Sequence, residues 1–205
     1  NVPMPADEGL RKLFTNPMML TLYAGSSSIA RKYEGDKRFR FLPTSSYGEL
    51  LWNFNEAQLA KHLEDCEHDL DEQTWHIFLL RCLVPALAYR MEEEGQFFIP
   101  TRKALNPAFN FKSLLDEAFV ALNREELSEI FPEFEGKRSL LGLSEIADMD
   151  AREQRSLKVR QYLVEKMHLL VAEDEALRFV HQNFRDFFAA CHLRNVAKMA
   201  ILKKN

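Results

Sequence analysis

The 205-residue chain has a net charge of −4, with 46% hydrophobic and 28% charged residues, a composition typical of a soluble globular protein. This charge gives no basic signal for binding nucleic acid or an anionic membrane, and no apolar run approaches the roughly 20 residues that span a bilayer. The N-terminus lacks both an initiator Met and the basic and apolar regions of a signal peptide, so we expect it to lie within a longer chain.

The first elements expected along the chain are helices. Residues 7–14 predict a short helix, and a second helix begins at Pro17, where Asn16 is the candidate N-cap. Proline fits the first helical position because the N–H that it lacks would have no partner inside the helix. Apolar residues continue this helix to about Ala24, and the polar, basic stretch 25–41 predicts a loop.

Two longer helices follow. Ser46 and Glu49 have the spacing of a capping box. The helix behind them has apolar residues at helical intervals, namely Leu50, Leu51, Phe54, Ala57 and Leu59. It is expected to end within the acidic stretch 64–71. The apolar side of the next helix comprises Trp75, Phe78, Leu79, Cys82, Leu83, Ala86 and Leu87. Pro85 is expected to kink that helix or shift its start, and Gly95 to cap its C-terminus.

The C-terminal half predicts a small sheet as well as helices. Residues 96–99 predict a short strand. Further helices are expected over 110–122, 125–131 and 151–167. The apolar runs 169–171 and 177–180 flank the polar turn 172–176, which indicates a β-hairpin. Helices followed by a hairpin are the order of a winged helix. A last helix follows His181, and its apolar stripe comprises Phe184, Phe187, Phe188, Ala190 and Cys191.

No strong catalytic or metal-binding motif occurs in the sequence. The string nearest to a phosphate-binding loop, 134–139, lacks the upstream glycine and does not follow a strand. His62 and Cys66, with His68 nearby, have a spacing compatible with a metal site, but their acidic surroundings favour a solvated surface. The three cysteines have no close pairs, which favours reduced thiols in the cytosol. A solvated loop, rather than a phosphate contact, is favoured for the basic residues Arg31, Lys32, Lys37, Arg38 and Arg40.

His181 and Pro17 are the candidate ligand-binding residues. His181 precedes a predicted helix N-terminus, where free N–H groups and the helix dipole favour an anion, and its imidazole can add a hydrogen bond to a phosphate oxygen. Pro17 offers a flat apolar ring on which a nucleobase can pack. On spacing alone each residue is better explained structurally, His181 as a cap or packing residue and Pro17 as the start of a helix.

Three strings resemble the NACHT-type NTPases, which belong to the signal-transduction ATPases with numerous domains. TNPMMLTLYA (15–24) is similar to the Asn-Pro-Leu-x-Leu segment that opens their helical domain, and FLPTSSYGELLWNF (41–54) is similar to the Leu-Pro pattern that follows it. FVHQNFRDFFAACHL (179–193) is similar to the signature Phe-x-His-x-x-Phe-x-Glu-Tyr-Phe-Ala-Ala at the end of their winged-helix domain. The strings occur in the family's order and bracket nearly the whole chain.

This resemblance implies a mainly α fold, with a helical domain over 1–70 followed by a winged-helix domain over 71–205 that contains a small β-hairpin. In the family these domains close over ADP or ATP held by a P-loop domain. The proline of the first segment packs near the adenine, and the histidine of the last segment reaches the β-phosphate of ADP. Those roles fall on Pro17 and His181.

The chain departs from the family pattern in several places. Asp186 and Phe187 stand where Glu and Tyr are usual, which keeps the acid and the ring, and Met18 stands where Leu is common. Residues 100–155 match no segment of the family. The P-loop domain is absent from this chain, so the family's ATPase activity is not carried over to it.

The sequence therefore predicts a non-catalytic, cytoplasmic lid that senses ADP or ATP bound to the P-loop domain of the same protein, controls self-oligomerisation and serves innate-immune signalling. Nucleotide exchange would release the His181 contact and free the winged helix to rotate. The chain alone is expected to bind nucleotide weakly or not at all. Two other classes stay open. One is a winged-helix nucleic-acid binder, which needs a basic recognition helix. The other is a helical adaptor for protein partners, which an exposed apolar patch away from His181 would favour.

Overall fold

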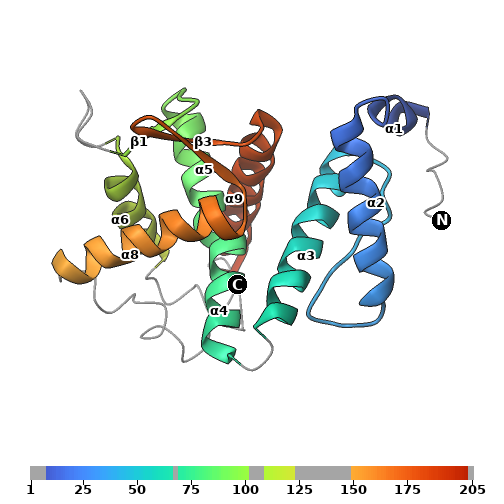
Figure 1. The fold of residues 1–205 in the computed structure, drawn as a ribbon, viewed down its shortest axis with the longest axis horizontal. Helices are drawn as coiled ribbons and strands as arrows, with labels where there is room; N and C mark the ends of the chain where they lie inside the picture. Colours follow the sequence, from blue (N-terminus) through green and yellow to red (C-terminus); the bar gives the residue numbers. More distant parts are fainter. Residues whose placement is uncertain (1–7, 67–68, 102–108, 123–148, 203–205) are drawn as a thin grey trace. The chain divides into compact units, whose positions relative to one another are not determined.

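The computed structural model describes residues 8–66, 69–101, 109–122 and 149–202. The protein is mainly α-helical with a small three-stranded antiparallel sheet, as the sequence predicts (Figure 1). Its contacts divide the chain into two compact units, Asn1–His76 and Ile77–Asn205. This boundary falls within α4 (Leu70–Phe78). The family resemblance placed the domain boundary after residue 70, at the start of the same helix.

The first unit contains α1 (Glu8–Leu13), α2 (Pro17–Lys32), α3 (Tyr47–Asp65) and most of α4, and α2 packs against α3. Both expected N-caps are confirmed. The side chain of Asn16 accepts from the Met18 N–H at 2.9 Å, and the hydroxyl of Ser46 accepts from the Glu49 N–H at 3.2 Å. The carboxylate of Glu49 turns back to the Ser45 N–H at 2.8 Å, one residue earlier than an ordinary capping box.

Helix α2 is longer than the sequence predicts, and the loop expected from residue 25 was wrong up to Lys32. Ser26 is buried, and its hydroxyl donates to the carbonyl of Leu22 at 2.7 Å, so the serine is satisfied inside the helix. One face, comprising Met19, Leu22, Tyr23 and Ser26, is buried. Packing against α3 therefore outweighs the polar composition of this stretch. The loop begins only after Tyr33, whose N–H closes the helix on Ile29 at 3.1 Å.

Side chains of α3 hold the extended chain that leads into this helix. The side chain of Asn53 accepts from the Leu42 N–H and donates to the Leu42 carbonyl, both at 2.7 Å. The carboxylate of Glu56 accepts from the Arg40 N–H at 2.8 Å, and the indole of Trp52 donates to the Arg40 carbonyl at 2.6 Å. Alternate residues are thus bonded as they would be by a neighbouring strand. These bonds fasten the start of the segment 41–54, which resembles the second family segment, to the helix that follows it.

The helix that begins with α4 is continuous through Pro85. It runs from α4 through a π-helical turn (Leu79–Leu83) into α5 (Val84–Glu93). Pro85 offers no N–H to the carbonyl of Arg81, four residues earlier. The buried side chain of Asn195 donates to that carbonyl at 3.0 Å instead. A kink or a shifted helix start was expected at this proline. The structure has a π-helical turn ahead of it instead, and a side chain from the last helix donates to the Arg81 carbonyl.

The end of α5 is a glycine cap, as predicted. Gly95 has a φ of +62°, a conformation that costs a residue with a Cβ about 1 kcal/mol or more. The Gln96 N–H donates to the Met91 carbonyl at 2.8 Å, and the Gly95 N–H donates to the Glu92 carbonyl at 3.0 Å. The strand that follows, β1 (Ile99–Pro100), is shorter and begins later than the one expected over 96–99.

The remaining elements complete a winged-helix order. They are α6 (Phe111–Leu122), α8 (Met149–Gln161) with a π-helical turn (Tyr162–Lys166), β2 (Leu170–Glu173), β3 (Ala176–Phe179) and α9 (Gln182–Leu202). The hairpin β2–β3 is confirmed, and β1 pairs with β3, which gives the sheet order β1-β3-β2. The helix expected over 125–131 and the rejected loop string 134–139 lie outside the described residues.

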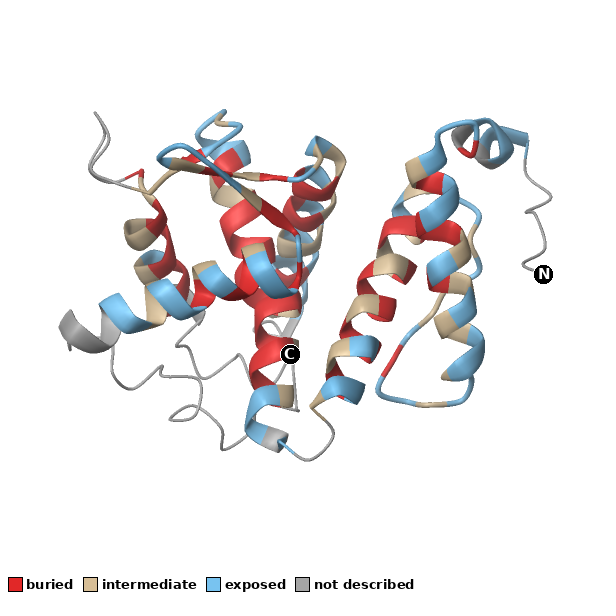
Figure 2. Cartoon of the chain, viewed as in Figure 1, coloured by how far each residue is buried: buried red, intermediate tan, exposed pale blue. Residues whose placement is uncertain are grey.

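The core of the second unit lies around α5, which Figure 2 shows buried along most of its length. Helix α9 packs on it, and Phe184 and Phe188 of the predicted stripe are buried. Ala190 was wrongly assigned to that stripe because it is exposed, and the buried row continues instead to Asn195. No helix within the described ranges has the length and apolarity that a membrane crossing needs.

Candidate functional site

His181 lies at the junction of the hairpin and α9. The Val180 N–H donates to the Leu169 carbonyl at 3.0 Å, which carries the pairing of β2 and β3 up to this junction. The His181 carbonyl accepts from the Phe184 N–H at 3.1 Å, and its Nδ1 accepts from the Asn183 N–H at 3.2 Å. His181 is therefore the N-cap of α9, and its ring accepts the hydrogen bond that a Ser or Asp side chain usually accepts at this position.

This capping bond determines which ring nitrogen can donate. Because Nδ1 of His181 accepts, the proton of the neutral ring is assigned to Nε2. The side chain is half-buried, and no described residue accepts from Nε2. The N-terminus of α9 thus combines a histidine N–H donor with the positive end of a helix dipole, a pair that suits an anionic oxygen. The Asn183 N–H donates to the His181 ring, so it is not available to donate to an anion at the same helix end.

Pro17 is the exposed first residue of α2, in the first unit, whereas His181 belongs to the second. The Asn16 cap fixes the start of the helix, so the proline ring is held at a defined position on the surface. Its structural role as the first helical residue is confirmed. A flat apolar ring at a fixed helix start can pack on another flat ring.

A charged cluster that the sequence did not single out surrounds the first turn of α9. The buried guanidinium of Arg185 meets the carboxylate of Glu92 at 2.5 Å and that of Asp186 at 3.1 Å, and it donates to the Gln96 carbonyl at 3.1 Å. Burial, followed by a hydrogen bond with Asp186, raises the pKa of the Glu92 carboxyl, and Arg185 opposes this rise. The only signal for this cluster in the sequence is an arginine placed between the phenylalanines of an apolar stripe.

The candidate metal site takes a different form in the structure. The Cys66 thiol donates to the carbonyl of His62 at 2.9 Å, and the His62 ring meets that of His76 edge-on at 5.3 Å between centroids. Burial, with help from Glu72, raises the pKa of the Cys66 thiol, which disfavours the thiolate that binds metal. Within the described residues no group of three His, Cys, Asp or Glu side chains is placed to hold a metal ion, and His68 lies outside them.

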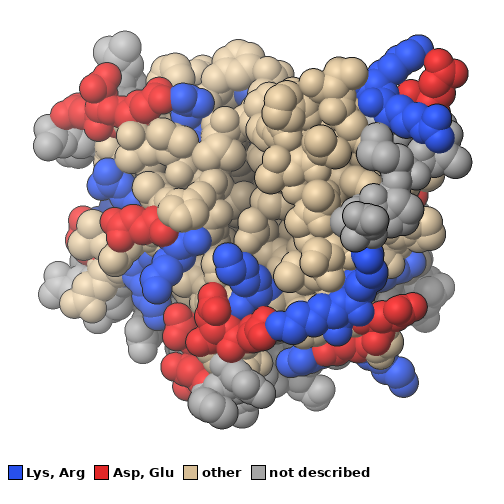
Figure 3. All heavy atoms as spheres, turned by 45° about the vertical axis from the view of Figure 1, so that its right-hand side comes forward, with Lys and Arg blue, Asp and Glu red and all other residues tan. Residues whose placement is uncertain are grey.

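Two of the basic residues at the end of α2 and in the loop after it form ion pairs with acids. Lys32 contacts Glu64 at 2.5 Å, and Arg38 contacts Asp36 at 2.8 Å. On the face shown in Figure 3, Lys and Arg side chains alternate with Asp and Glu side chains. This pairing agrees with the solvated reading of these residues rather than with a phosphate-binding patch.

The tip of the hairpin is acidic. Three exposed acids, Glu173, Asp174 and Glu175, follow one another there, and Asp174 has a φ of +51°. Arg178 forms an ion pair with Glu173, its Nε lying 2.8 Å from the carboxylate.

Searches against protein-family models, curated proteins and solved structures found no match to this chain.

Proposed function

We propose that the chain is the regulatory lid and switch module of a NACHT-type signal-transduction NTPase in the cytoplasm. Its partner would be the P-loop domain of the same protein, and its ligand the ADP or ATP held there. The module would report the nucleotide state and control self-oligomerisation. Three strings in family order support this proposal, together with the winged-helix order of the second unit.

The observation that carries the proposal is the capped His181 ring. Its Nε2–H lies at a helix N-terminus, where one diphosphate oxygen would gain both a donor and the dipole. A hydrogen bond to a charged group contributes about 1.5–3 kcal/mol, which shifts a two-state equilibrium roughly 10- to 100-fold. A ligand that makes this contact in only one state therefore has enough differential affinity to act as a switch.

A winged-helix nucleic-acid binder is less well supported. The acidic hairpin tip would repel phosphates. On α8, Arg155 turns back over the ring of Phe119 at 4.4 Å, and Glu153 pairs with Lys112 at 2.7 Å. The helix in the recognition position thus does not present a continuous basic face. DNA binding that weakens steeply with salt would revive this alternative.

A protein-interaction adaptor has one specific observation in its favour. The second half of α9 exposes apolar side chains, with Leu193 at 53%, Val196 at 41% and Ile201 at 62% exposure. This face lies several turns from His181 and is not explained by nucleotide sensing. Binding of a partner that Leu193→Asp abolishes, while nucleotide has no effect on it, would favour the adaptor over the lid.

The direct test is an ADP titration of the ¹⁵N-labelled chain followed by NMR. One histidine contact and one helix end correspond to a dissociation constant of about 1 mM or weaker. We expect any shifts to centre on the amides of Asn183 and Phe184 and to vanish in His181→Ala. His168→Ala is the matched control, because His168 is exposed on the same unit. Submicromolar binding, or shifts that persist without His181, would contradict the proposal.

A second test needs only the gene. We expect the coding sequence upstream of Asn1 to contain Gly-x-x-x-x-Gly-Lys-Ser/Thr within about one domain length. Its absence would remove the P-loop partner and leave the adaptor as the better proposal. This test decides the matter even if the chain alone binds too weakly to titrate.

A further inference from the structure

Arg185 is a charged side chain in a place where charge is costly. It lies one turn after His181 on α9, and only 7% of its side chain is exposed. The residues on either side of it along the stripe, Phe184 and Phe188, are buried as well. A buried guanidinium pays for lost hydration unless carboxylates and carbonyls surround it, so its partners indicate what it is for.

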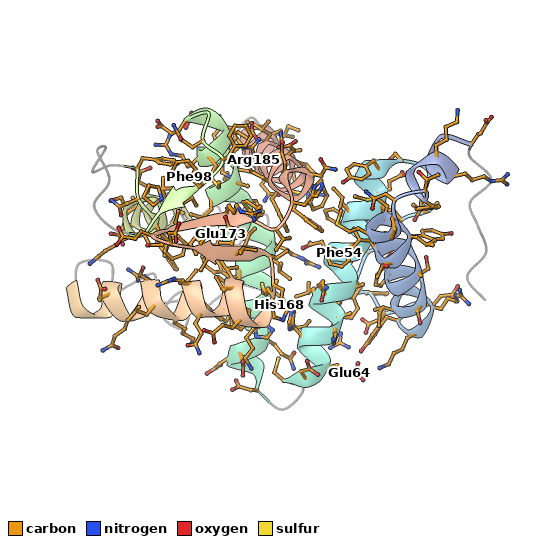
Figure 4. The ribbon with its side chains drawn as sticks, turned by 45° about the horizontal axis from the view of Figure 1, so that its top comes forward. Phe54, Glu64, Phe98, His168, Glu173 and Arg185 are labelled. Carbon is orange, nitrogen blue, oxygen red and sulfur yellow. The ribbon has the colours of Figure 1, made fainter. Side chains whose placement is uncertain are left out.

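Those partners come from two helices and the turn after the first. The Nε of Arg185 meets Glu92 at 2.5 Å in the last turn of α5, and its Nη1 donates to the Gln96 carbonyl at 3.1 Å. Its Nη2 meets Asp186 of α9 at 3.1 Å, and the guanidinium carbon lies 4.6 Å from the ring centroid of Phe97. Figure 4 shows Arg185 beside the end of α5. One planar cation therefore joins the start of α9 to the end of α5.

The end of α5 is itself well defined. The glycine cap at Gly95 bonds the Gln96 N–H back to Met91 and places the Gln96 carbonyl that Arg185 uses. Glu92 accepts through its backbone carbonyl from the Gly95 N–H and through its side chain from Arg185. The cap and the arginine thus share two residues, and a displacement of either would disturb the other.

The cluster is poorly suited to be a source of stability. One cation faces two carboxylates, and burial, followed by a hydrogen bond with Asp186, raises the pKa of Glu92 while Arg185 opposes the rise. The side chains of Glu92 and Asp186 are 39% and 49% exposed, and ion pairs whose carboxylates reach solvent contribute little to stability. The ion pairs of Arg185 instead fix the relative orientation of the groups that they join, because a guanidinium bonds only to partners in defined positions.

The hydrogen bond that caps α9 at His181 is sensitive to small changes in the geometry of the first turn. The distance between the Asn183 nitrogen and Nδ1 is 3.2 Å, at the long limit of an N–H hydrogen bond. A distortion of the first turn of α9 that moves Asn183 a few tenths of an ångström away from His181 is enough to break it. The ring would then be free to rotate, and its Nε2–H would lose its fixed direction.

We propose that Arg185 is a positioning residue that fixes the first turn of α9 on the end of α5 and thereby orients the His181 imidazole. The ligand that this orientation serves, a nucleoside diphosphate, rests on the proposed function. The positioning itself is a property of the unliganded chain and is measurable without nucleotide.

The test compares Arg185→Met with Arg178→Met in the ¹⁵N-labelled chain. Arg178 is the matched control, because it is an ion-paired arginine on the same unit whose side chain is 43% exposed. In Arg185→Met we expect exchange of the Asn183 amide to rise about tenfold, the loss of one net hydrogen bond. We expect the His181 ring nitrogens to move from the Nε2–H signature towards a mixture of tautomers. In Arg178→Met both should stay as in the wild type.

A purely structural role would not give this pattern. General destabilisation speeds exchange throughout β2, β3 and α5, whereas positioning affects Asn183 and the His181 ring alone. A folded Arg185→Met with unchanged Asn183 exchange and unchanged His181 ring shifts overturns the proposal. If Arg185→Met does not fold, Arg185→Lys decides, since one ammonium cannot reproduce the fork of bonds and should shift both readouts in the same direction. Unchanged readouts in folded Arg185→Lys overturn the proposal too.

The nucleotide arm is separate. Where wild type responds to ADP, Arg185→Met should weaken the response several-fold and Arg178→Met should not. An ADP response that is equally strong in Arg185→Met shows that the ligand does not need this orientation and overturns the proposal for the ligand. No response in wild type bears on the proposed function alone, because the exchange and tautomer measurements still decide the role of Arg185.

Discussion

Asn195 should stabilise the helix that passes through Pro85, and replacing it tests how. In Asn195→Ala the Arg81 carbonyl loses a part-buried hydrogen bond of 3.0 Å. Removing the donor of a part-buried hydrogen bond costs up to about 3 kcal/mol. The Oδ1 of Asn195 is itself buried with no hydrogen-bond partner among the described residues, and removing it offsets part of the loss. We therefore expect a net loss of about 1–2 kcal/mol.

Native-state amide exchange across α5 and α9 measures this loss directly. A cost of 1–2 kcal/mol corresponds to exchange roughly 5- to 30-fold faster in the most protected amides. Val196→Ala is the control, because Val196 is the next residue on α9 and is 41% exposed. Its effect should stay within about 0.5 kcal/mol.

A double-mutant cycle with Pro85→Ala tests the cause. An alanine at position 85 restores an N–H to the helix, which can donate to Arg81 in place of Asn195. The Asn195→Ala substitution should then cost less than half as much, a coupling of about 1 kcal/mol. An equal cost of Asn195→Ala in both backgrounds would refute the idea that the asparagine compensates for the proline.

Three further outcomes follow from the described contacts. Gly95→Ala should destabilise by about 1–2 kcal/mol because its φ is +62°, whereas Gly25→Ala inside α2 should stabilise by about 0.5–1 kcal/mol, both by urea unfolding, since neither Cβ would meet an atom within 4 Å. Asn53→Ala should free the chain at Leu42, which loses two bonds of 2.7 Å, and limited proteolysis should then cut ahead of α3 while wild type stays intact there. Burial lowers the pKa of the His192 imidazole, so the folded chain binds a proton there less tightly than the unfolded chain does. The free energy of unfolding should therefore fall as the pH drops below 6.5. Urea midpoints measured on both sides of pH 6.5 should show a smaller fall in His192→Phe than in the wild type.

Local chemistry explains which elements were predictable. The caps at Asn16 and Ser46, the glycine at Gly95 and the hairpin before His181 each depend on a few neighbouring residues. A hydroxyl or amide ahead of a helix, or a glycine behind it, acts in nearly the same way in any fold. These features were therefore recognisable from the sequence, and so was the place of His181 ahead of α9.

Burial is not visible in a local string, and it accounts for the wrong or missing assignments. The serines after Ala24 resemble a loop in the sequence, but α2 packs on α3, and Ser26 is buried with its hydroxyl donating to the Leu22 carbonyl. Ala190 looked like part of an apolar stripe although it faces outward. The pairing of β1 with β3 joins segments far apart in the chain, which no short pattern reveals.

The sequence by itself determined the mainly helical class, the helix starts, the hairpin and the position of His181 at a helix N-terminus, because these follow from local bonding and periodicity. Only the tertiary structure decided that Arg185 is buried between Glu92 and Asp186, that Asn195 completes the helix at Arg81, and that the His181 ring caps α9 through Nδ1. Each of these depends on a partner or an orientation that packing alone supplies, since the strength of a polar contact depends on how far burial removes it from water.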